Sequence, residues 1–242
     1  MSRYFIGVDD TDYGESIGTG ALARELSLHL ARALGGRSRG VTRHQLFVHP
    51  DIPYTSHNSA ACVELECDRG RGAVAEAASR FVAGLLHEGA DPGVCVCEAA
   101  PLLPALVAFG RSARDTVLCK ADAVALAAAT GLDCRELGGT GLGIVGALAA
   151  CGLRMTGDDG RFLSLPGARE LTGTLAAGEL AARAGIDRVV DEAGREVAAA
   201  SPVETGDWVR PDLRGGRIVL RVRAEGSGGS YVVLREKRMD KH

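Results

Sequence analysis

The hydrophobic pattern of the first two thirds of the chain predicts strands and helices in turn. Short apolar runs are typical of buried strands, and they occupy residues 4–8, 45–48, 59–66 and 94–97. Between residues 18 and 34 apolar residues recur at helical spacing, with Leu22, Leu26 and Leu30 on one face, before a glycine pair ends the pattern. Further helical patterns cover residues 73–87, 101–110, 121–129 and 144–151.

The pattern changes after about residue 167. A short helix is expected at 174–184, followed by alternating strands at 217–223 and 231–235 and by a polar tail that we expect to be frayed. The segment 157–160, which contains Asp158 and Asp159, is typical of a hairpin-type turn. The sequence therefore predicts an α/β domain over residues 1–167, a mixed sheet with flanking helices, and a small β-rich appendage over residues 168–242.

Composition narrows the class of protein. Hydrophobic residues make up 46% of the chain and aromatic residues only 4%, so the core is expected to be aliphatic and rich in alanine. The net charge of −3 argues against a general basic coat for nucleic acid but leaves a local basic groove open. No apolar run is long enough for a spanning helix and no signal segment is visible, so we expect a cytoplasmic protein without a membrane partner.

Three aspartates follow the first predicted strand directly. Asp9, Asp10 and Asp12 stand where a strand ends and a helix approaches, a place where α/β folds collect ligands. Adjacent carboxylates repel unless a cation lies between them, and Mg²⁺ is bound in proteins through one or two carboxylates together with phosphates. The pattern favours a magnesium site, and the alternative is a solvated cluster that caps the helix.

Hydroxyls and glycines surround these aspartates. Thr11 and Thr19 add oxygen ligands, while Gly18 and Gly20 would let backbone N–H groups approach a phosphate at the start of the helix. We therefore hypothesise that this stretch binds a nucleotide, with Thr11, Gly18 and Gly20 among its contacts.

A second glycine-rich segment covers residues 138–152. Gly141, Gly143 and Gly146 match the spacing of a dinucleotide-binding loop, but the segment before them is a poor buried strand and the acidic pair that follows lies in a turn. A Rossmann fingerprint is therefore disfavoured. Two interpretations stay open, which are phosphate binding by Gly141 and Gly143 and tight packing of a helix.

The loop at residues 50–58 is a candidate substrate site. Tyr54, His57 and Asn58 could grip a small substrate or a single-stranded base. The spacing of His44, His49 and His57 fits no standard zinc pattern, and ordinary loop polarity is the alternative.

Taken together, the motifs resemble a known family. GVDDTD near the N-terminus, Thr19, the loop P-D-I-P-Y, the turn D-P-G-V and the glycine motif that starts at Gly139 occur in the order seen in the N-terminal domain of archaeal agmatinylcytidine synthetase, the enzyme that modifies the CAU-anticodon isoleucine tRNA. The resemblance spans residues 4–165. It implies a kinase-like α/β module that uses ATP to activate a cytidine oxygen.

The resemblance also implies roles for single residues. Asp9, Asp10 and Asp12 would handle metal and phosphates, and Thr19 would lie at the phosphoryl-transfer centre, because the family phosphorylates a threonine at this place. Gly141 and Gly143 would line the nucleotide site. The expected cofactors are ATP and magnesium.

Some family features are absent from the sequence. The ferredoxin-like, OB-fold and zinc-ribbon domains that the family uses for tRNA and agmatine have no counterpart, and Leu142 stands where the family has an arginine. We therefore expect a stand-alone relative of the kinase-like domain. Its acceptor would be a nucleobase oxygen or a small molecule; tRNA is open but the net charge does not support it, and a homodimer is open too. The alternative is a non-catalytic protein that binds a nucleotide or another small ligand.

Overall fold

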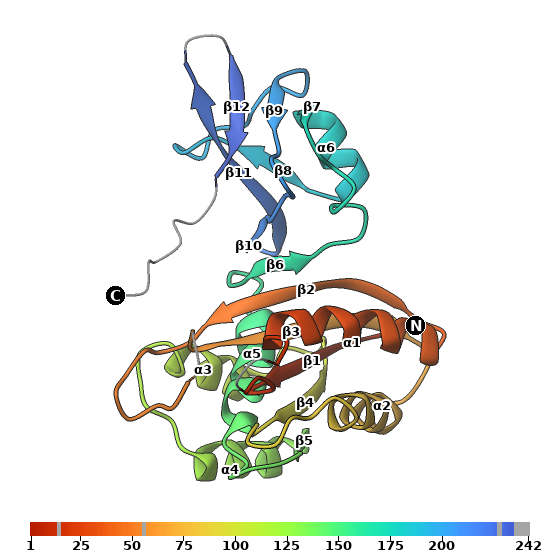
Figure 1. The fold of residues 1–242 in the computed structure, drawn as a ribbon, viewed down its shortest axis with the longest axis vertical. Coiled ribbons are helices and arrows are strands. Elements are labelled where there is room, and N and C mark those ends of the chain that lie inside the picture. The colour runs from red at the N-terminus through yellow and green to blue at the C-terminus, as the bar shows by residue number, and fades with distance from the viewer. Residues whose placement is uncertain (14–15, 55–56, 227–228, 235–242) are drawn as a thin grey trace. The chain divides into compact units, whose positions relative to one another are not determined.

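The computed structural model describes residues 1–13, 16–54, 57–226 and 229–234, and Figure 1 shows their fold. They form two compact units, Met1–Ser164 and Leu165–His242, and each is described by itself. Within these described ranges, no helix is both long enough and apolar enough to cross a membrane.

The first unit is an antiparallel sheet covered by helices. Its strands are β1 (Ser2–Asp9), β2 (Arg37–Gln45), β3 (Ser59–Cys67), β4 (Gly93–Glu98), β5 (Asp133–Glu136) and β6 (Arg161–Ser164). They lie in the order β5-β4-β1-β3-β2-β6, and the neighbouring pairs are antiparallel. Its helices are α1 (Thr19–Ala33), α2 (Arg71–Ala83), α3 (Pro104–Ser112), α4 (Lys120–Thr130) and α5 (Gly143–Met155).

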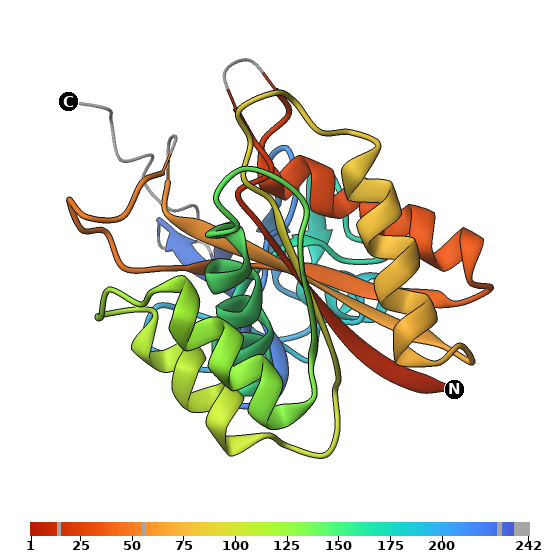
Figure 2. The same ribbon diagram turned by 90° about the horizontal axis from the view of Figure 1, so that it is seen from below.

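The alternation of side chains along β1 creates three layers. Tyr4, Ile6 and Val8 are buried on the face covered by α1 and α2, whereas Phe5 belongs to the core formed with α3, α4 and α5. Figure 2 shows the two groups of helices on opposite faces of the sheet. The sheet therefore has a hydrophobic core on each side.

Helix α5 packs unusually close to the sheet. A Cβ atom on Gly7 of β1 would lie 1.9 Å from the carbonyl oxygen of Ala147, and one on Gly93 of β4 would lie 2.2 Å from the backbone of Gly143. Helix α5 is buried along most of its length, in keeping with its nearly uninterrupted apolar sequence. The glycines of β1 and β4 make this contact possible.

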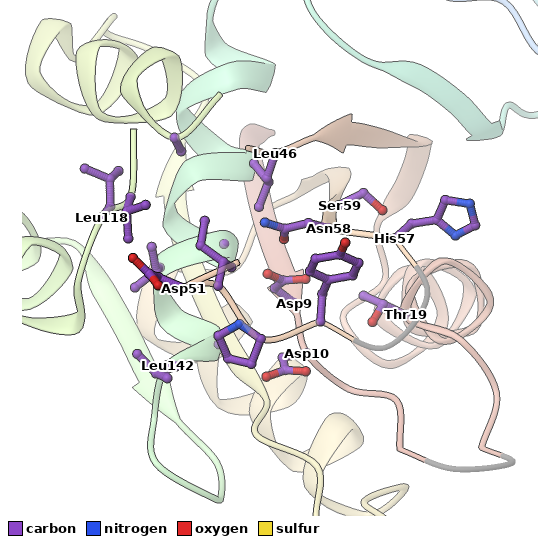
Figure 3. A pocket seen from close by; sticks show the side chains of 18 of the residues that line it. Asp9, Asp10, Thr19, Leu46, Asp51, His57, Asn58, Ser59, Leu118 and Leu142 are labelled. Atoms are coloured by element: carbon purple, nitrogen blue, oxygen red, sulfur yellow. The ribbon is translucent and has the colours of Figure 1, made fainter. Parts of the chain in front are cut away.

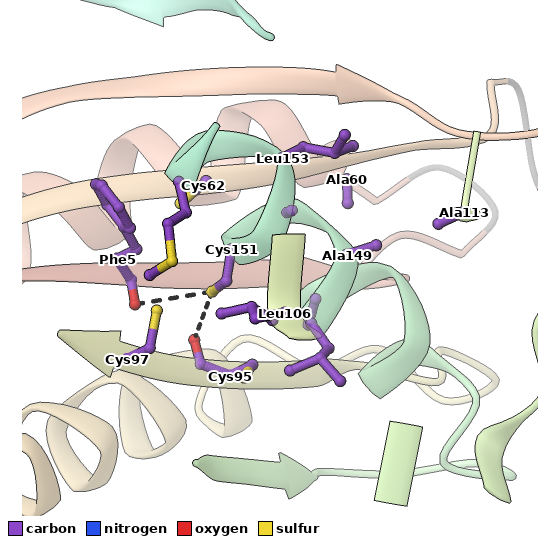
Figure 4. Packing of buried hydrophobic residues seen from close by; sticks show 14 of the residues in the cluster. Phe5, Ala60, Cys62, Cys95, Cys97, Leu106, Ala113, Ala149, Cys151 and Leu153 are labelled. Carbon is purple, nitrogen blue, oxygen red and sulfur yellow. Dashed lines mark hydrogen bonds between the residues drawn. The ribbon is translucent and has the colours of Figure 1, made fainter. Parts of the chain in front are cut away.

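Cysteines fill part of the core beside α5. The thiol of Cys151 donates to the carbonyl oxygens of Phe5 and Cys95, at 3.8 and 3.5 Å, and Cys62 and Cys97 pack around it (Figure 4). The cysteines of the described residues are free thiols. Cys62, Cys95, Cys97 and Cys151 serve this core as small hydrophobic residues.

The second unit is small and rich in strands. Its elements are β7 (Thr174–Ala176), α6 (Ala177–Ala184), β8 (Arg188–Val190), β9 (Pro202–Glu204), β10 (Asp212–Arg214), β11 (Arg217–Glu225) and β12 (Ser230–Val233). Strand β11 pairs antiparallel with β10 and β12 and parallel with β8, and β12 pairs parallel with β9. Leu180 and Leu220 are fully buried in it.

The predicted α/β fold class is confirmed. The strand pairing is mixed, and the parallel pairs, β11 with β8 and β12 with β9, lie in the second unit. The strand predicted at 45–48 is wrong, because β2 ends at Gln45 and begins at Arg37. Thr42 and His44 are buried polar residues of β2 that bond each other, with 2.8 Å between Thr42 Oγ1 and His44 Nε2, so a hydrophobic pattern could not reveal this strand.

Two other predictions change in detail. The helix expected at 174–184 is a strand, β7, followed by helix α6. The turn at 157–160 joins helix α5 to β6 and therefore is not the hairpin that its glycines suggested. The predicted strand at 231–235 matches β12 as far as Val233, while residue 235 and the polar tail lie outside the described residues.

The contact between β1 and α5 predicts the effect of a small substitution. Gly7→Ala would force a methyl group into the carbonyl of Ala147, so we expect a loss of ~1–3 kcal/mol in the free energy of unfolding. Gly72→Ala, an exposed helical position with open space around it, should cause no loss. Urea unfolding of both variants checks this, and equal midpoints would contradict it.

Candidate functional site

A cavity of about 270 Å³ opens at the edge of the first unit where β1 ends. Antiparallel pairing brings the end of β1 and the starts of β3 and β4 to the same edge of the sheet. Figure 3 shows side chains from the end of β1, the start of β3, the loop after β2 and α1 around the cavity. Residues of the segments 46–54, 57–59 and 113–119 and of the first turn of α5 complete its walls.

The lining of this cavity has two kinds of side chain. It includes the apolar side chains of Leu46, Ile52, Val117, Leu118 and Val145. It also includes the three predicted aspartates, Asp51 and Thr19. A ligand that joins a flat apolar ring to a charged group, as a nucleotide does, would match both kinds.

Burial perturbs the carboxylates of this lining. Burial first, and then the charges of Asp10 and Asp12, raise the pKa of Asp9 to about 7. Burial, followed by the charges of Asp91 and Asp12, raises the pKa of Asp10 to about 6. Asp10 also has a backbone φ of +54°, a left-handed conformation that aspartate tolerates better than most residues.

These carboxylates fit a cation that also binds phosphates. Among the described residues, no group of three or more His, Cys, Asp or Glu side chains forms a ready metal-binding cluster. Magnesium does not need one, because it usually keeps several waters and binds through one or two carboxylates and substrate phosphates. Asp9 and Asp10 line the first cavity, whereas Asp12 accepts the hydrogen bond of Thr19, so Asp9 and Asp10 are the candidate ligands.

The hydroxyl of Thr19 lies at the centre of a hydrogen-bonded group. It donates to Oδ1 of Asp12 at 2.9 Å and accepts from Oγ1 of Thr11 at 3.1 Å. Gly18 is the N-cap of α1, so Thr19 is the first residue of that helix. Thr11 and Thr19 are both buried, which fixes the position of this hydroxyl.

A second cavity, of about 250 Å³, lies on the other side of Thr19. Asp12, Thr19, His57 and Ser59 line both cavities. The lining that belongs to the second cavity alone includes Gly18, Gly20, Arg24 and Arg43. The first cavity is therefore acidic and apolar, whereas the second contributes two guanidinium groups.

The glycine loop before α5 has an internal partner. Oδ1 of Asp91 accepts from the N–H of Gly141 at 2.6 Å, and its Oδ2 accepts from the N–H of Leu142 at 3.2 Å. Gly143 lines the first cavity, and its backbone packs directly against Gly93 of β4. The sequence signalled Asp91 only as part of a turn and did not show that its carboxylate binds the loop.

The candidate substrate residues Tyr54, His57 and Asn58 all line the first cavity, and Figure 3 shows His57 and Asn58 beside Ser59. The amide of Asn58 also donates to the carbonyl of Phe47, so it holds the loop in place. His44 lies elsewhere: it is buried, and its Nδ1 is 2.8 Å from Oδ1 of Asp159.

Asp159, which the sequence placed in a turn, also makes tertiary hydrogen bonds. Asp159 bonds His44 and also accepts from Arg114 at 2.6 Å, so it connects β2 to the loop between α3 and α4. Burial lowers the pKa of His44 despite the nearby carboxylate. These bonds of Asp159 help to hold the segment 113–119, which lines the first cavity, in place.

No protein-family model and no curated protein matches the chain. Several solved structures do match the chain. A tRNA fluorescent labeling enzyme matches with a TM-score of 0.54 and 27% identity, over 62% of this chain and 36% of that one. The fold of this chain is thus similar to part of the fold of an enzyme that labels tRNA.

The more particular match is to TiaS, an agmatidine synthetase for an isoleucine tRNA. Its complex with tRNA and ATP has a TM-score of 0.55 and 26% identity, over 63% of this chain and 36% of TiaS. The complex with tRNA, AMPCPP and agmatine gives a TM-score of 0.55 and 25% identity. The resemblance inferred from the motifs is confirmed, and this chain spans about a third of the length of these structures.

The raised pKa of Asp9 predicts how stability depends on pH in the metal-free protein. The folded state keeps a proton that the unfolded chain releases above pH ~4, so this contribution to stability is lost as the pH rises towards about 7. Asp9→Asn cannot ionise. We expect its advantage in Tm over the wild type to grow by several degrees between pH ~5 and pH ~8.

Thermal unfolding in the presence of a chelator measures this difference. Glu192→Gln, at an exposed position of the second unit, is the matched control and should run parallel to the wild type at each pH. An Asp9→Asn curve that also runs parallel to the wild type would contradict the assignment.

Proposed function

We propose that this chain is an ATP- and magnesium-dependent phosphoryl-transfer enzyme related to tRNA modification. The observation that carries the proposal is the position of the Thr19 hydroxyl, bonded to Asp12 and shared by an acidic and an arginine-lined cavity. The similarity to TiaS structures that contain tRNA and ATP supports it. Because the chain covers about a third of those proteins, the activity of the whole relative remains part of the proposal.

The first cavity would bind ATP. Its apolar side chains suit the adenine ring, and its carboxylates suit a metal-bound triphosphate. Magnesium, when bound, would neutralise the charge of the migrating phosphoryl group. Asp9 and Asp10 would hold it, and the cation would favour their ionised forms against the burial and the neighbouring carboxylates that raise the pKa of both carboxyls.

Thr19 would be the residue nearest to the chemistry. Its Oγ1 would attack the terminal phosphorus of ATP, so that a new O–P bond forms, the bond to the bridging oxygen breaks and ADP leaves. Asp12 already accepts a hydrogen bond from this hydroxyl and would take its proton. Thr11 orients the same oxygen from the other side.

The glycines would have separate roles. Gly18 and Gly20 would let the first turn of α1 approach the phosphates, and Gly143 would line the nucleotide. The N–H of Gly141 would become available to a phosphate only after Asp91 moved away from it.

The acceptor would enter from the second cavity and attack the phosphorus carried by Thr19, so that the bond from Oγ1 to phosphorus breaks and Oγ1 regains its proton from Asp12. Water in place of the acceptor would release phosphate. Arg24 and Arg43 would attract an anionic group there, while His57 lies at the boundary of both cavities. Tyr54 and Asn58 would contact the acceptor or the nucleotide from the loop side. A nucleobase oxygen and an oxygen of a small molecule both fit this role.

Thr19 and Asp10 give the decisive variants. We expect ATP turnover that requires Mg²⁺, and a loss of ~100-fold or more in kcat for Thr19→Val, which lacks the hydroxyl but keeps the shape. Thr19→Ser should retain most of the activity. Asp10→Asn should weaken the dependence on Mg²⁺ and lower turnover together. Release of phosphate from ATP and mass spectrometry for phosphate on Thr19 provide the two measurements.

Asp115→Asn is the matched control, because this exposed carboxylate lies outside the lining of both cavities. ATP binding without any turnover, unchanged in Thr19→Val, would instead identify a non-catalytic nucleotide-binding protein. Wild-type protein that neither binds nor hydrolyses ATP would refute both.

A further inference from the structure

The second unit carries a local concentration of positive charge. Residues 208–223 contain five arginines and one carboxylate, Asp212, a net charge of +4 in a chain whose formal charge is −3. Four of these arginines, Arg214, Arg217, Arg221 and Arg223, lie on strands β10 and β11 and are named here the arginine surface.

The strand register brings these four side chains together. Arg214 is the direct partner of Arg217 across the β10–β11 pair. Side chains two residues apart point to the same side of a strand, so Arg217, Arg221 and Arg223 share one side of β11. The turn between the strands, Gly215-Gly216, has φ angles of +54° and +72°, as a tight hairpin requires.

This arrangement is electrostatically unfavourable for the fold itself. Like charges directly opposite each other on paired strands are destabilising. The buried carboxylate of Asp212 accepts from Arg221 at 2.7 Å and lies 3.8 Å from Arg214, so two arginines share it. The side chains of Arg214 and Arg221 are 57% and 41% exposed. The surface therefore keeps excess positive charge in contact with solvent.

Two more guanidinium groups lie against the aromatic ring of Trp208. Those of Arg210 and Arg169 are 4.3 and 5.1 Å from the centre of that ring. Cation–π contacts hold both groups in fixed orientations. Planar guanidinium groups and aromatic rings of this kind can stack on unpaired nucleobases.

The distribution of exposed hydrophobic side chains indicates which kind of partner the arginine surface would bind. The large hydrophobic side chains that are exposed among the described residues all belong to the first unit. A membrane surface or an obligate protein interface would need such apolar anchors, whereas phosphate groups need only the charges. Guanidinium groups bind phosphate oxygens in a bidentate fashion.

We propose that the arginine surface binds the phosphate backbone of a single-stranded polynucleotide. The four guanidinium groups bridge successive phosphates along β10 and β11, and the Trp208 region receives an unpaired base. The matches to solved structures cover 62–63% of this chain, so this surface is assigned from its own geometry. It does not require the ATP chemistry of the first unit.

The test measures binding of a fluorescent single-stranded RNA of ~12 nucleotides, and of the same DNA sequence, to the full chain over a range of salt concentrations. If four phosphates are contacted, the logarithm of the association constant should fall with the logarithm of salt concentration with a slope of ~−3. Arg214→Gln combined with Arg217→Gln should weaken binding ~10-fold or more and reduce the slope by ~1.4.

The control removes the same charge from the same unit. Arg183 and Arg195 are exposed, are paired with Glu179 and Asp191, and lie outside strands β10 and β11; changing both to Gln should leave the affinity within ~2-fold of the wild-type value. Equal losses in the two double variants would overturn the proposal. Thermal unfolding verifies folding, and Arg223→Gln alone gives a second measure if the hairpin variant is unstable.

Two further measurements distinguish a polynucleotide from a lipid surface, and the arginine surface from the ATP site. Vesicles that contain phosphatidylserine should bind weakly, and binding of vesicles in preference to oligonucleotides would overturn the assignment to nucleic acid. Asp10→Asn should leave oligonucleotide binding unchanged even if it abolishes ATP turnover. A failure of the catalytic proposal is thus distinguishable from a failure of this one.

Discussion

The close packing of α5 against the central strands is the constraint on which the first unit depends. Glycines at positions 7 and 93 let the helix approach the backbone of the sheet, and a Cβ atom on Gly146 would lie 1.7 Å from a carboxylate oxygen of Asp9. The same contact thus fixes the helix, closes the core and presses Asp9 against the start of α5. The burial that raises the pKa of Asp9 is a product of this packing.

The antiparallel order of the strands makes the site gather residues from distant parts of the chain. In a parallel sheet a site forms at the carboxyl ends of the strands. Here the end of β1 meets the start of β3 and the start of β4 at one edge, because neighbouring strands run in opposite directions. Residues near positions 10, 58 and 92 therefore become neighbours, and residues of the segments 46–54 and 113–119 line the same cavity.

Much of the local chemistry could be predicted from the sequence. The acid and hydroxyl residues between positions 9 and 19 are neighbours in the chain, so their clustering required only the turn that joins β1 to α1. Long-range pairings left no such signal. Asp91 beside Gly141, Asp159 beside His44, and Arg24 and Arg43 around one cavity depend on tertiary contacts that neither periodicity nor motif spacing encodes. Strand β2 was missed because its buried positions include a threonine and a histidine that satisfy each other.

The bonds of Asp91 have a consequence for how the glycine loop would respond to ligands. Its two carboxylate oxygens occupy the backbone N–H groups of Gly141 and Leu142, which is how the oxygens of a phosphate would sit in such a loop. The loop is thus ordered by an anion that the chain itself supplies, and it needs no ligand to keep its shape. Any phosphate arriving there must compete with a tethered carboxylate, so the loop would exchange one anion for another.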